Sequence, residues 1–339
     1  MGYKKEAEYA GIALKTLLGD NRDFVGPLLK QGQQDQALFK KIIKENNVTV
    51  RVLSRLGKDV LNNWNLHDVL YKERMRVKKN LQFLSEIKAI LDKEKIEYLV
   101  IKSLDNYPDI GRDLDIFILS DRDKAVQALL ARFKGTIARP VISEVLADKT
   151  NIEFNGLPKV EIHHQRLGVL GEDLLYPKII LRNKKLEDID ARPFFVPCDE
   201  DRVILAAEHR INRHFNLRIC DVYNALRFTK QANFDWNYLW DTAKTLGLKD
   251  SVAFYLDYVK KVEESIVKHK DLAGFNKAIA VRKSFLRFPV LGVIAKAHSK
   301  RFCRFVKSLD FRAALRVFLV IPLLLLASAQ KFLGRKSSW

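Results

Sequence analysis

The spacing of the apolar residues changes twice along this chain, and the change limits the folds that the chain can adopt. Up to about residue 95, apolar positions recur at helical spacing, as in Leu14, Leu17 and Leu18. A short apolar run at Tyr98–Ile101 begins a region with the pattern of strands, and helical spacing returns after Pro197. This order predicts an α+β fold in which helices lie on both sides of a strand-rich core.

The strand-rich region is predicted to contain a loop, a helix and a hairpin between its strands. Residues 102–112 include Asp, Asn, Pro and Gly, which favour a loop. Ser120-Asp121 is a suitable helix N-cap, and Asn155-Gly156 is typical of a hairpin turn. The predicted elements are strands at Tyr98–Ile101, Leu114–Leu119, Asn151–Phe154 and Lys159–Gln165, and a helix at Asp123–Phe133.

The region after Pro197 is predicted to form a helical lobe. Its four candidate helices are Asp201–Phe215, Leu217–Thr229, Trp236–Thr245 and Val252–Val267. Trp236 and Trp240 lie four residues apart, which favours a core position over a stacking surface for bases. We expect an N-terminal helical region at residues 1–75, an α/β core at 76–196, the helical lobe at 197–280, and a basic, hydrophobic C-terminal segment at 281–339.

The composition excludes several classes of protein. Hydrophobic residues make up 47% of the chain and aromatic residues 10%, which is enough for a packed core and argues against disorder. Cys198, Cys220 and Cys303 lie far apart, so neither a disulfide framework nor a clustered zinc site is expected. The N-terminus lacks the apolar segment of a signal peptide, so we expect a cytoplasmic protein. No P-loop motif is present in the sequence.

The net charge of +19 is concentrated near the C-terminus. From Arg282 to Trp339 the chain has thirteen Lys and Arg residues and one acid, Asp310, so about +12 of the charge lies in 58 residues. Such a segment attracts anions, either lipid headgroups or nucleic acid.

Within this C-terminal segment, Val317–Ala329 is the most apolar run of the chain. Its thirteen residues are fewer than the roughly 17–25 that a membrane-spanning helix needs. We therefore expect residues 310–339 to lie in or dip into an anionic membrane surface, and a buried core or dimer helix is the alternative. Nucleic acid is less favoured as a partner because it does not require an apolar run. The basic residues predicted to contact headgroups are Arg304, Lys307, Arg312, Lys331, Arg335 and Lys336.

Two aspartates on one predicted strand form the first part of a candidate site. Alternate side chains of a strand share a face, so Asp113 and Asp115 project together. Leu114 and Ile116 then face the opposite way, into a core. Two neighbouring acids repel each other unless a cation neutralises them, which makes the pair a natural seat for a divalent metal.

A third carboxylate comes from the strand at residues 159–165, where Glu161 and His163 share a face. Three converging carboxylates can hold two metal ions, one that activates a hydroxyl and one that neutralises a triphosphate. Glu161 is also a candidate to accept the proton that this hydroxyl loses. Glu153 on the partner strand is the alternative third carboxylate. The alternative is that these acids are simply solvated on an exposed face. Because clustered acids repel, removing one is not expected to lower stability without metal.

These elements resemble, in order, the motifs of the nucleotidyltransferase superfamily that includes DNA polymerase beta, and within it an uncharacterised bacterial and archaeal branch. The resemblance covers roughly residues 75–260. It rests on Leu99-Val-Ile-Lys102-Ser103, Tyr107-Pro108, Arg112, Asp113-Leu-Asp115, Val160-Glu-Ile-His163, Glu208-His209, Asp221 and Asp235-Trp236.

The resemblance implies a small mixed β-sheet core, with Asp113, Asp115 and Glu161 as catalytic residues and as ligands of Mg²⁺ or Mn²⁺. It implies that Lys102, Ser103, Arg112 and His209 bind the nucleotide. The branch has a glycine where Ser103 stands, and glycine allows a closer approach of the backbone to phosphate. Phosphate binding at this turn therefore depends on the hydroxyl and N–H of Ser103 and on nearby positive charge.

Two positions of the helical lobe have a simpler interpretation as well. His209 is equally compatible with a satisfied position in the core. Arg218 and Asp221 lie three residues apart on one predicted helix, so the two side chains are expected to pair.

The expected activity is transfer of a nucleoside monophosphate from a nucleoside triphosphate such as ATP to a hydroxyl group, with release of pyrophosphate. The acceptor is unknown and is either a small molecule or a protein. One alternative is an inactive relative that binds nucleotide, protein or membrane. Another is a nucleic-acid-binding protein that uses the basic C-terminal segment.

Overall fold

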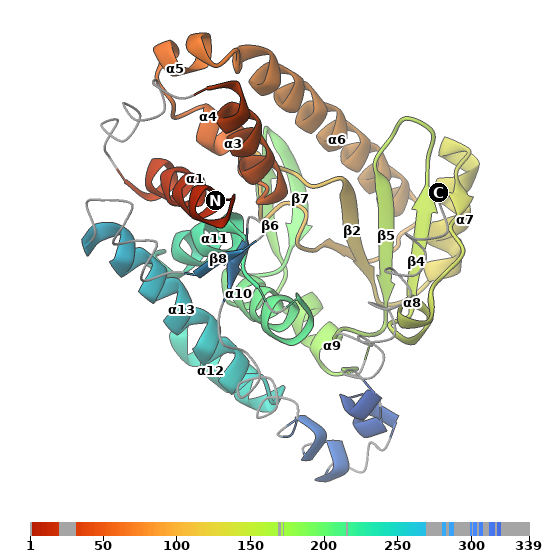
Figure 1. The fold of residues 1–339 in the computed structure, drawn as a ribbon. Helices are drawn as coiled ribbons and strands as arrows, with labels where there is room; N and C mark the ends of the chain where they lie inside the picture. The colour runs from red at the N-terminus through yellow and green to blue at the C-terminus, as the bar shows by residue number, and fades with distance from the viewer. Residues whose placement is uncertain are drawn as a thin grey trace, which may run out of the picture.

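The computed structural model describes residues 2–19, 32–168, 171, 173–214 and 216–268, and short pieces beyond them: 280–282, 285–287, 299, 301–303, 305–307, 312–315 and 317–319. N-terminal helices lead into a mixed sheet, and a helical lobe follows (Figure 1). This arrangement confirms the predicted α+β fold.

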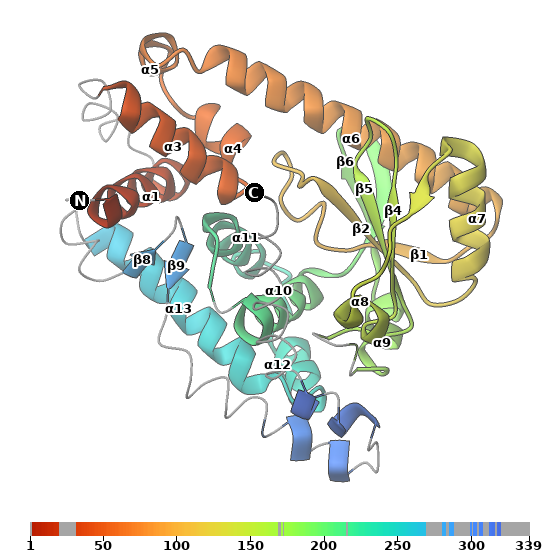
Figure 2. The ribbon, with the colours of Figure 1, turned by 45° about the vertical axis from the view of Figure 1, so that its right-hand side comes forward.

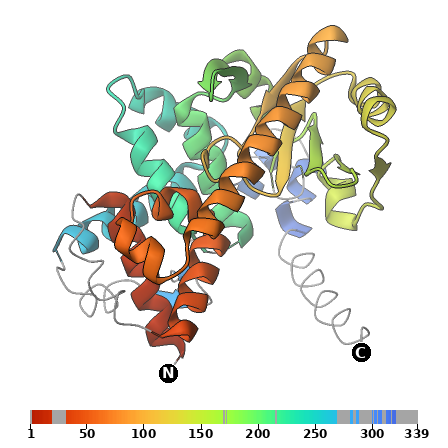
Figure 3. The ribbon, with the colours of Figure 1, turned by 90° about the horizontal axis from the view of Figure 1, so that it is seen from above.

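The N-terminal region forms helices, as its apolar spacing predicts. Leu14 and Leu17 of the first helix are buried in the same core cluster as Phe39 and Trp64. The last of these helices, α6, runs from the N-terminal helices to the sheet (Figure 3), where Leu84 packs on the strands. The helices are α1 (Gly2–Leu18), α3 (Gln33–Glu45), α4 (Thr49–Leu53), α5 (Lys58–Asn63) and α6 (His67–Lys93).

The sheet has five strands in the order β1-β2-β5-β4-β3. The neighbouring strands β2 and β5 run parallel, and the other pairs are antiparallel. The parallel pairing follows from the crossover between β2 and β5, which contains α7 and the strand β4. The strands are β1 (Tyr98–Val100), β2 (Asp113–Ile118), β3 (Thr136–Ile137), β4 (Lys149–Glu153) and β5 (Lys159–His164), with α7 (Arg122–Phe133) and α8 (Ile142–Leu146) between them.

The two faces of the sheet are covered by different parts of the chain (Figure 2). Leu114 and Ile116 of β2 face α6 and α7, which confirms the predicted alternation. On the other face Phe117 joins the core that the N-terminal helices and the helical lobe share. Asp113 and Asp115 precede Phe117 on this second face, where the covering helices leave a cavity. Because this core includes both helical parts, we propose that residues 1–75, 76–196 and 197–280 are parts of one cooperative unit, whereas the C-terminal segment at 281–339 is a separate part.

The helical lobe follows a small hairpin that sequence patterns did not predict. The hairpin strands have five residues each, and neither shows a strict alternation of apolar and polar residues, so their signal is weak. The elements are α9 (Tyr176–Arg182), β6 (Lys185–Ile189), β7 (Arg192–Val196), α10 (Asp199–Ala207), η2 (Glu208–His214), α11 (Ile219–Thr229), α12 (Trp236–Thr245) and α13 (Lys249–Lys268). The four predicted helices are confirmed, although the first is a regular helix, α10, followed by a π-helical segment, η2.

Three local predictions need correction. Asp121 precedes α7 in a left-handed conformation and makes no side-chain capping bond. The hairpin of β4 and β5 turns over residues 154–158, which is longer than the Asn155-Gly156 turn alone. Trp240 packs against the core, but Trp236 is 44% exposed and contacts the ring of Phe234, so it is not a core residue.

Little of the C-terminal segment lies within the described residues. Among those residues, none of the helices combines the length and the apolar character that crossing a membrane requires. Of the apolar run Val317–Ala329, only residues 317–319 are described. The predicted contacts Arg304, Lys331, Arg335 and Lys336 fall outside the described residues. The described pieces include the short strands β8 (Ala280–Arg282) and β9 (Phe285–Arg287).

Candidate active site

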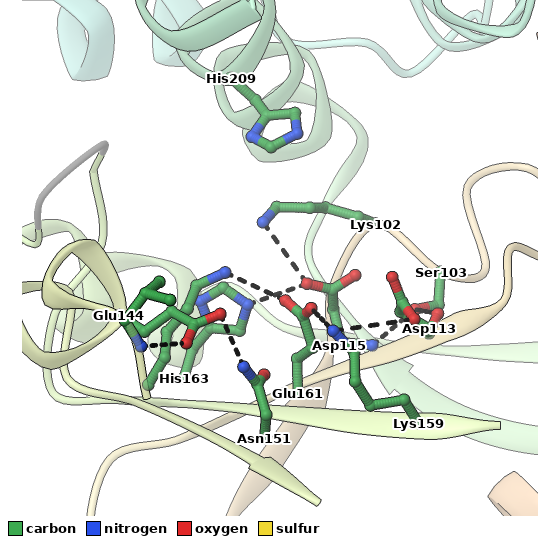
Figure 4. A network of polar contacts seen from close by, with 12 residues as sticks. Lys102, Ser103, Asp113, Asp115, Glu144, Asn151, Lys159, Glu161, His163 and His209 are labelled. Carbon is green, nitrogen blue, oxygen red and sulfur yellow. Dashed lines mark hydrogen bonds and ion pairs between the residues drawn. The ribbon is translucent and has the colours of Figure 1, made fainter. Parts of the chain in front are cut away.

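The pairing of β2 with β5 brings the predicted carboxylates together. Asp115 lies directly opposite Glu161 in the parallel register, and Asp113 precedes them on the same face (Figure 4). All three line one cavity of about 420 Å³ between the sheet and the helical lobe. The Asp115 and Glu161 side chains are mostly buried, at 17% and 16% exposed, whereas Asp113 is 51% exposed at the cavity edge.

The mostly buried pair has a third neighbour that fits a metal ion. Asp115, Glu161 and His163 each offer a ligand atom, and these atoms lie within 4.8 Å of one another. His163 follows Glu161 at the next outward position of β5, and its Nε2 lies 2.9 Å from Asp115 Oδ1. Asp113 is not part of this group of three, so its place among the metal ligands stays a prediction. The sequence signal for His163 was its position two residues after Glu161, which places both side chains on the same face of β5.

Every carboxylate of the cluster already faces an ammonium group. Lys159 Nζ lies 2.6 Å from Glu161 Oε1, and Lys149 Nζ lies 3.1 Å from Glu161 Oε2. Lys102 Nζ is 3.6 Å from Asp115 Oδ1. The expectation of unrelieved repulsion between the acids is therefore wrong, because lysines from three different segments neutralise them.

The lysines keep the buried carboxylates ionised. Burial works in the opposite direction, but Lys149 and Lys159 lower the pKa of Glu161 to about 2. Burial also acts to raise the pKa of Asp115, but Lys102 and His163 hold that pKa far below its usual value. Burial raises the pKa of Asp113, and Lys159 offsets this only in part. Asp115 and Glu161 thus suit a metal ion, while Asp113 is the more basic carboxylate.

The wall opposite the carboxylates comes from η2 and α11 and is strongly basic. Arg210, Arg213 and Arg218 line the cavity there. Arg210 Nε pairs with Asp221 Oδ2 at 2.7 Å. The guanidinium groups of Arg213 and Arg218 form no salt bridge with an acid in the described part of the chain. Two unpaired guanidinium groups over a cavity attract an anion.

A pair of histidines lies within this basic wall. His209 Nε2 lies 3.0 Å from His214 Nε2, because the π-helical segment places residues five apart on one side. Burial, together with Lys102 and Arg210, lowers the pKa of His209 well below its usual value. Burial and the neighbouring arginines lower the pKa of His214 to about 3. Both rings are neutral at pH 7, so one ring nitrogen donates a hydrogen bond to the other.

The structure settles two alternatives that the sequence left open. His209 is not enclosed in the apolar core: it lines the cavity and extends toward Lys102 (Figure 4). The predicted side-chain pair of Arg218 and Asp221 is wrong. The backbone N–H of Arg218 donates to Asp221 at 2.6 Å, while the Asp221 carboxylate binds the guanidinium of Arg210.

The turn after β1 arranges Lys102 and Ser103 in an unexpected way. The left-handed residue of this turn is Lys102, at φ +61°, and not Ser103. Replacing glycine by serine at position 103 therefore imposes no backbone strain. The Ser103 hydroxyl accepts a hydrogen bond from the N–H of Asp115 at 2.8 Å, and the Ser103 N–H donates to Ile101. These contacts occupy the groups expected to meet phosphate, and they hold Asp115 in place.

The loop between β1 and β2 is tied to both helical parts of the protein. Arg51 of α4 binds Asp109 of this loop at 2.8 Å, and both side chains are buried. Arg202 of α10 lies 3.3 Å from the carboxylate of Asp105. Asn224 of α11 accepts from Arg51. These buried contacts fix the loop that carries Lys102, Ser103 and Arg112; Arg112 is exposed at the cavity edge.

Comparison with protein families agrees with this geometry. A family model described as an uncharacterised nucleotidyltransferase matches residues 33–262. A comparison with curated proteins finds no match. The matched range contains the carboxylates, the lysines and the basic wall.

The lysine contacts predict how the metal-free protein responds to loss of Glu161. Glu161→Gln leaves the buried Lys149 ammonium with a neutral partner, so we expect the free energy of unfolding to fall by about 1–3 kcal/mol. Chemical denaturation in the presence of EDTA measures this change. Asp113→Asn is the matched control and is expected to change stability little, because that carboxylate is half exposed and 3.9 Å from Lys159. Equal or greater stability of the Glu161→Gln variant would contradict this account.

Proposed function

Because the chain belongs to an uncharacterised nucleotidyltransferase family, we propose that it transfers a nucleoside monophosphate from a nucleoside triphosphate, such as ATP, to a hydroxyl group and releases pyrophosphate. The observation that carries the proposal is the placement of Asp115 beside Glu161, opposite a basic wall across one cavity. Acids that hold metal and cations that hold phosphate are the two requirements of phosphoryl chemistry.

The residues present fit a divalent metal ion. Oxygen ligands from Asp115 and Glu161 suit Mg²⁺, and the added nitrogen of His163 suits Mn²⁺. His163 can equally orient the Asp115 carboxylate through their 2.9 Å hydrogen bond. When bound, the metal supplies charge that neutralises the triphosphate and lowers the pKa of the attacking hydroxyl.

The basic wall supports binding of the triphosphate. Arg213 and Arg218 are free of salt bridges with the described acids and face the cavity. Lys102 reaches the same space from the sheet side, as does Arg112 at the edge. If His214 donates to His209 Nε2, the neutral His209 ring can donate a hydrogen bond from Nδ1 without adding charge. We propose that these groups hold the phosphates, while Ser103 supports the strand instead.

The proton of the attacking hydroxyl is better accepted by Asp113 than by Glu161. Glu161 is contacted by two lysines, and its pKa of about 2 makes it a weak base. Burial raises the pKa of Asp113, which lies at the open edge of the cavity where an acceptor can enter. We therefore propose Asp113 as the general base in place of Glu161.

The activity proposal predicts the effect of removing one buried carboxylate. Asp115→Asn is expected to lower the rate of nucleotidyl transfer at least about a hundredfold, because several kcal/mol of transition-state stabilisation are lost. Transfer is measured with four labelled nucleoside triphosphates, Mg²⁺ or Mn²⁺, and a mixture of metabolites and proteins as acceptors. Glu153→Gln is the matched control, since Glu153 is exposed on β4 and does not line the cavity.

Three results would count against the proposal. If Glu153→Gln abolishes transfer and Glu161→Gln does not, the third carboxylate is Glu153. If Asp115→Asn matches an active wild-type protein, catalysis does not use this site. If the wild-type protein binds a triphosphate with metal but transfers nothing to any acceptor, the alternative of an inactive nucleotide-binding relative is correct.

We also propose that the C-terminal segment associates with an anionic membrane surface. Arg301 is buried and lies 3.6 Å from Glu208, which ties this segment to the helical lobe. Lys307 and Arg312 are exposed in the same short helical pieces. Apolar side chains exposed there, suited to a lipid surface, are Phe302, Val306, Leu315 and Phe318.

The membrane proposal predicts the behaviour of a truncated chain. Deleting residues 310–339 is expected to move the protein from the membrane fraction to the soluble fraction and to leave its melting temperature unchanged. Sedimentation with vesicles of neutral lipid, compared with vesicles that contain anionic lipid, measures the charge dependence. A full-length protein that stays monodisperse without detergent and ignores anionic vesicles would contradict the proposal.

A further inference from the structure

Lys149 differs from the other two lysines of the site, Lys102 and Lys159, in that its side chain is much more buried. Its side chain is 8% exposed, compared with 25% for Lys102 and 29% for Lys159. It lies on β4 at the position paired with His163 of β5, so the sheet itself directs it toward Glu161. The distance from its Nζ to Glu161 Oε2 is 3.1 Å.

Both oxygens of Glu161 already accept a hydrogen bond from an ammonium group. Lys159 donates to Oε1 and Lys149 to Oε2. A metal ion that coordinates Glu161 therefore meets two ammonium groups at the same carboxylate, and the repulsion between these positive charges favours displacement of at least one ammonium group. Lys159 is partly exposed and can turn into solvent at small cost. Lys149 cannot reach solvent in the same way, so its displacement leaves a buried charge without a partner.

We propose that Lys149 acts as the counter-ion of Glu161 and suppresses binding of a divalent cation. A triphosphate relieves this suppression when its phosphate oxygens bind the Lys149 ammonium group in place of Glu161. This inference rests on the proposed function, and it specifies that the metal ion binds tightly only together with the triphosphate. Lys149 lines the same cavity as Arg213 and Arg218, so a triphosphate bound there is within the space that Lys149 faces.

The charge of the cavity supports the joint entry of metal and nucleotide. Seven Lys and Arg side chains and five Asp and Glu side chains line it, which gives a net charge of +2. A divalent cation alone raises this net charge to +4 in a partly buried space, which is unfavourable. A triphosphate brings several negative charges that offset both the metal and the lysine. Metal and triphosphate are thus expected to bind with strong positive coupling.

Binding of Mn²⁺ to the full-length protein, followed by electron paramagnetic resonance, tests the proposal without any turnover. In the wild type, Mn²⁺ alone is expected to bind weakly, and a triphosphate with a methylene group between its α and β phosphorus atoms is expected to tighten binding at least tenfold. Lys149→Met is expected to bind Mn²⁺ alone at least about tenfold more tightly and to lose most of the coupling. Lys149→Arg, which keeps the charge, is expected to behave like the wild type.

Two further variants separate the explanations. Lys159→Met is the matched control and is expected to change Mn²⁺ affinity much less than Lys149→Met. Adding Asp115→Asn to Lys149→Met is expected to remove the gain, which locates the ion at this site. If Lys149→Met fails to fold in thermal melts, Lys149→Gln takes its place.

Failure of this inference is distinguishable from failure of the proposed function. A neutral variant at Lys149 that binds Mn²⁺ no more tightly than the wild type overturns the counter-ion role, even if the enzyme is active. Equal gains from Lys149→Met and Lys159→Met also overturn it. If Lys149→Met raises the Mn²⁺ affinity of a protein that transfers no nucleotide, the counter-ion role is supported and only the proposed transfer activity is wrong.

Discussion

The parallel pairing of β2 with β5 is the constraint on which the rest of the site depends. It sets Asp115 directly opposite Glu161, and a shift of one residue would turn one of the two side chains into the apolar core. Leu114 and Ile116 prevent that shift because both are fully buried on the other face. The core that α6 and α7 form with this face of the sheet therefore also fixes the position of the acids on the other face. Ser103 adds a hydrogen bond to the backbone of Asp115 and secures the end of the strand.

Charge balance is the second organising feature. The acids on the sheet are matched by lysines, and the helical lobe contributes guanidinium groups, neutral histidines and one acid, Asp221, which is paired with Arg210. The buried pair of Arg51 and Asp109 holds the loop between these two walls. A site built in this way is stable without a ligand, yet Arg213 and Arg218 retain positive charge that no acid among the described residues pairs with. The arrangement is suited to a ligand that brings both a cation and several negative charges.

The sequence was most informative where one strand or helix decides the outcome. Alternation along β2 and β5 predicted that Asp113, Asp115 and Glu161 share a face, and helical spacing predicted the lobe. Lys149 was missed because the predicted strand begins at Asn151, whereas β4 begins at Lys149 and carries this side chain on the face of the site. The pairing of His209 with His214 depends on a π-helical segment, and the contact of Arg210 with Asp221 depends on packing between η2 and α11. Neither leaves a pattern in the spacing of residues.

The central claim is that Asp115 and Glu161 hold a metal ion against a triphosphate bound by the basic wall. The most direct measurement is anomalous diffraction from crystals grown with Mn²⁺ and the methylene-bridged triphosphate. The account predicts a manganese peak within bonding distance of both carboxylates, phosphates beside Arg213 and Arg218, and Lys149 turned from Glu161 toward a phosphate. A bound triphosphate without manganese at Asp115 and Glu161, or with Lys149 and Lys159 still paired to Glu161, would contradict it.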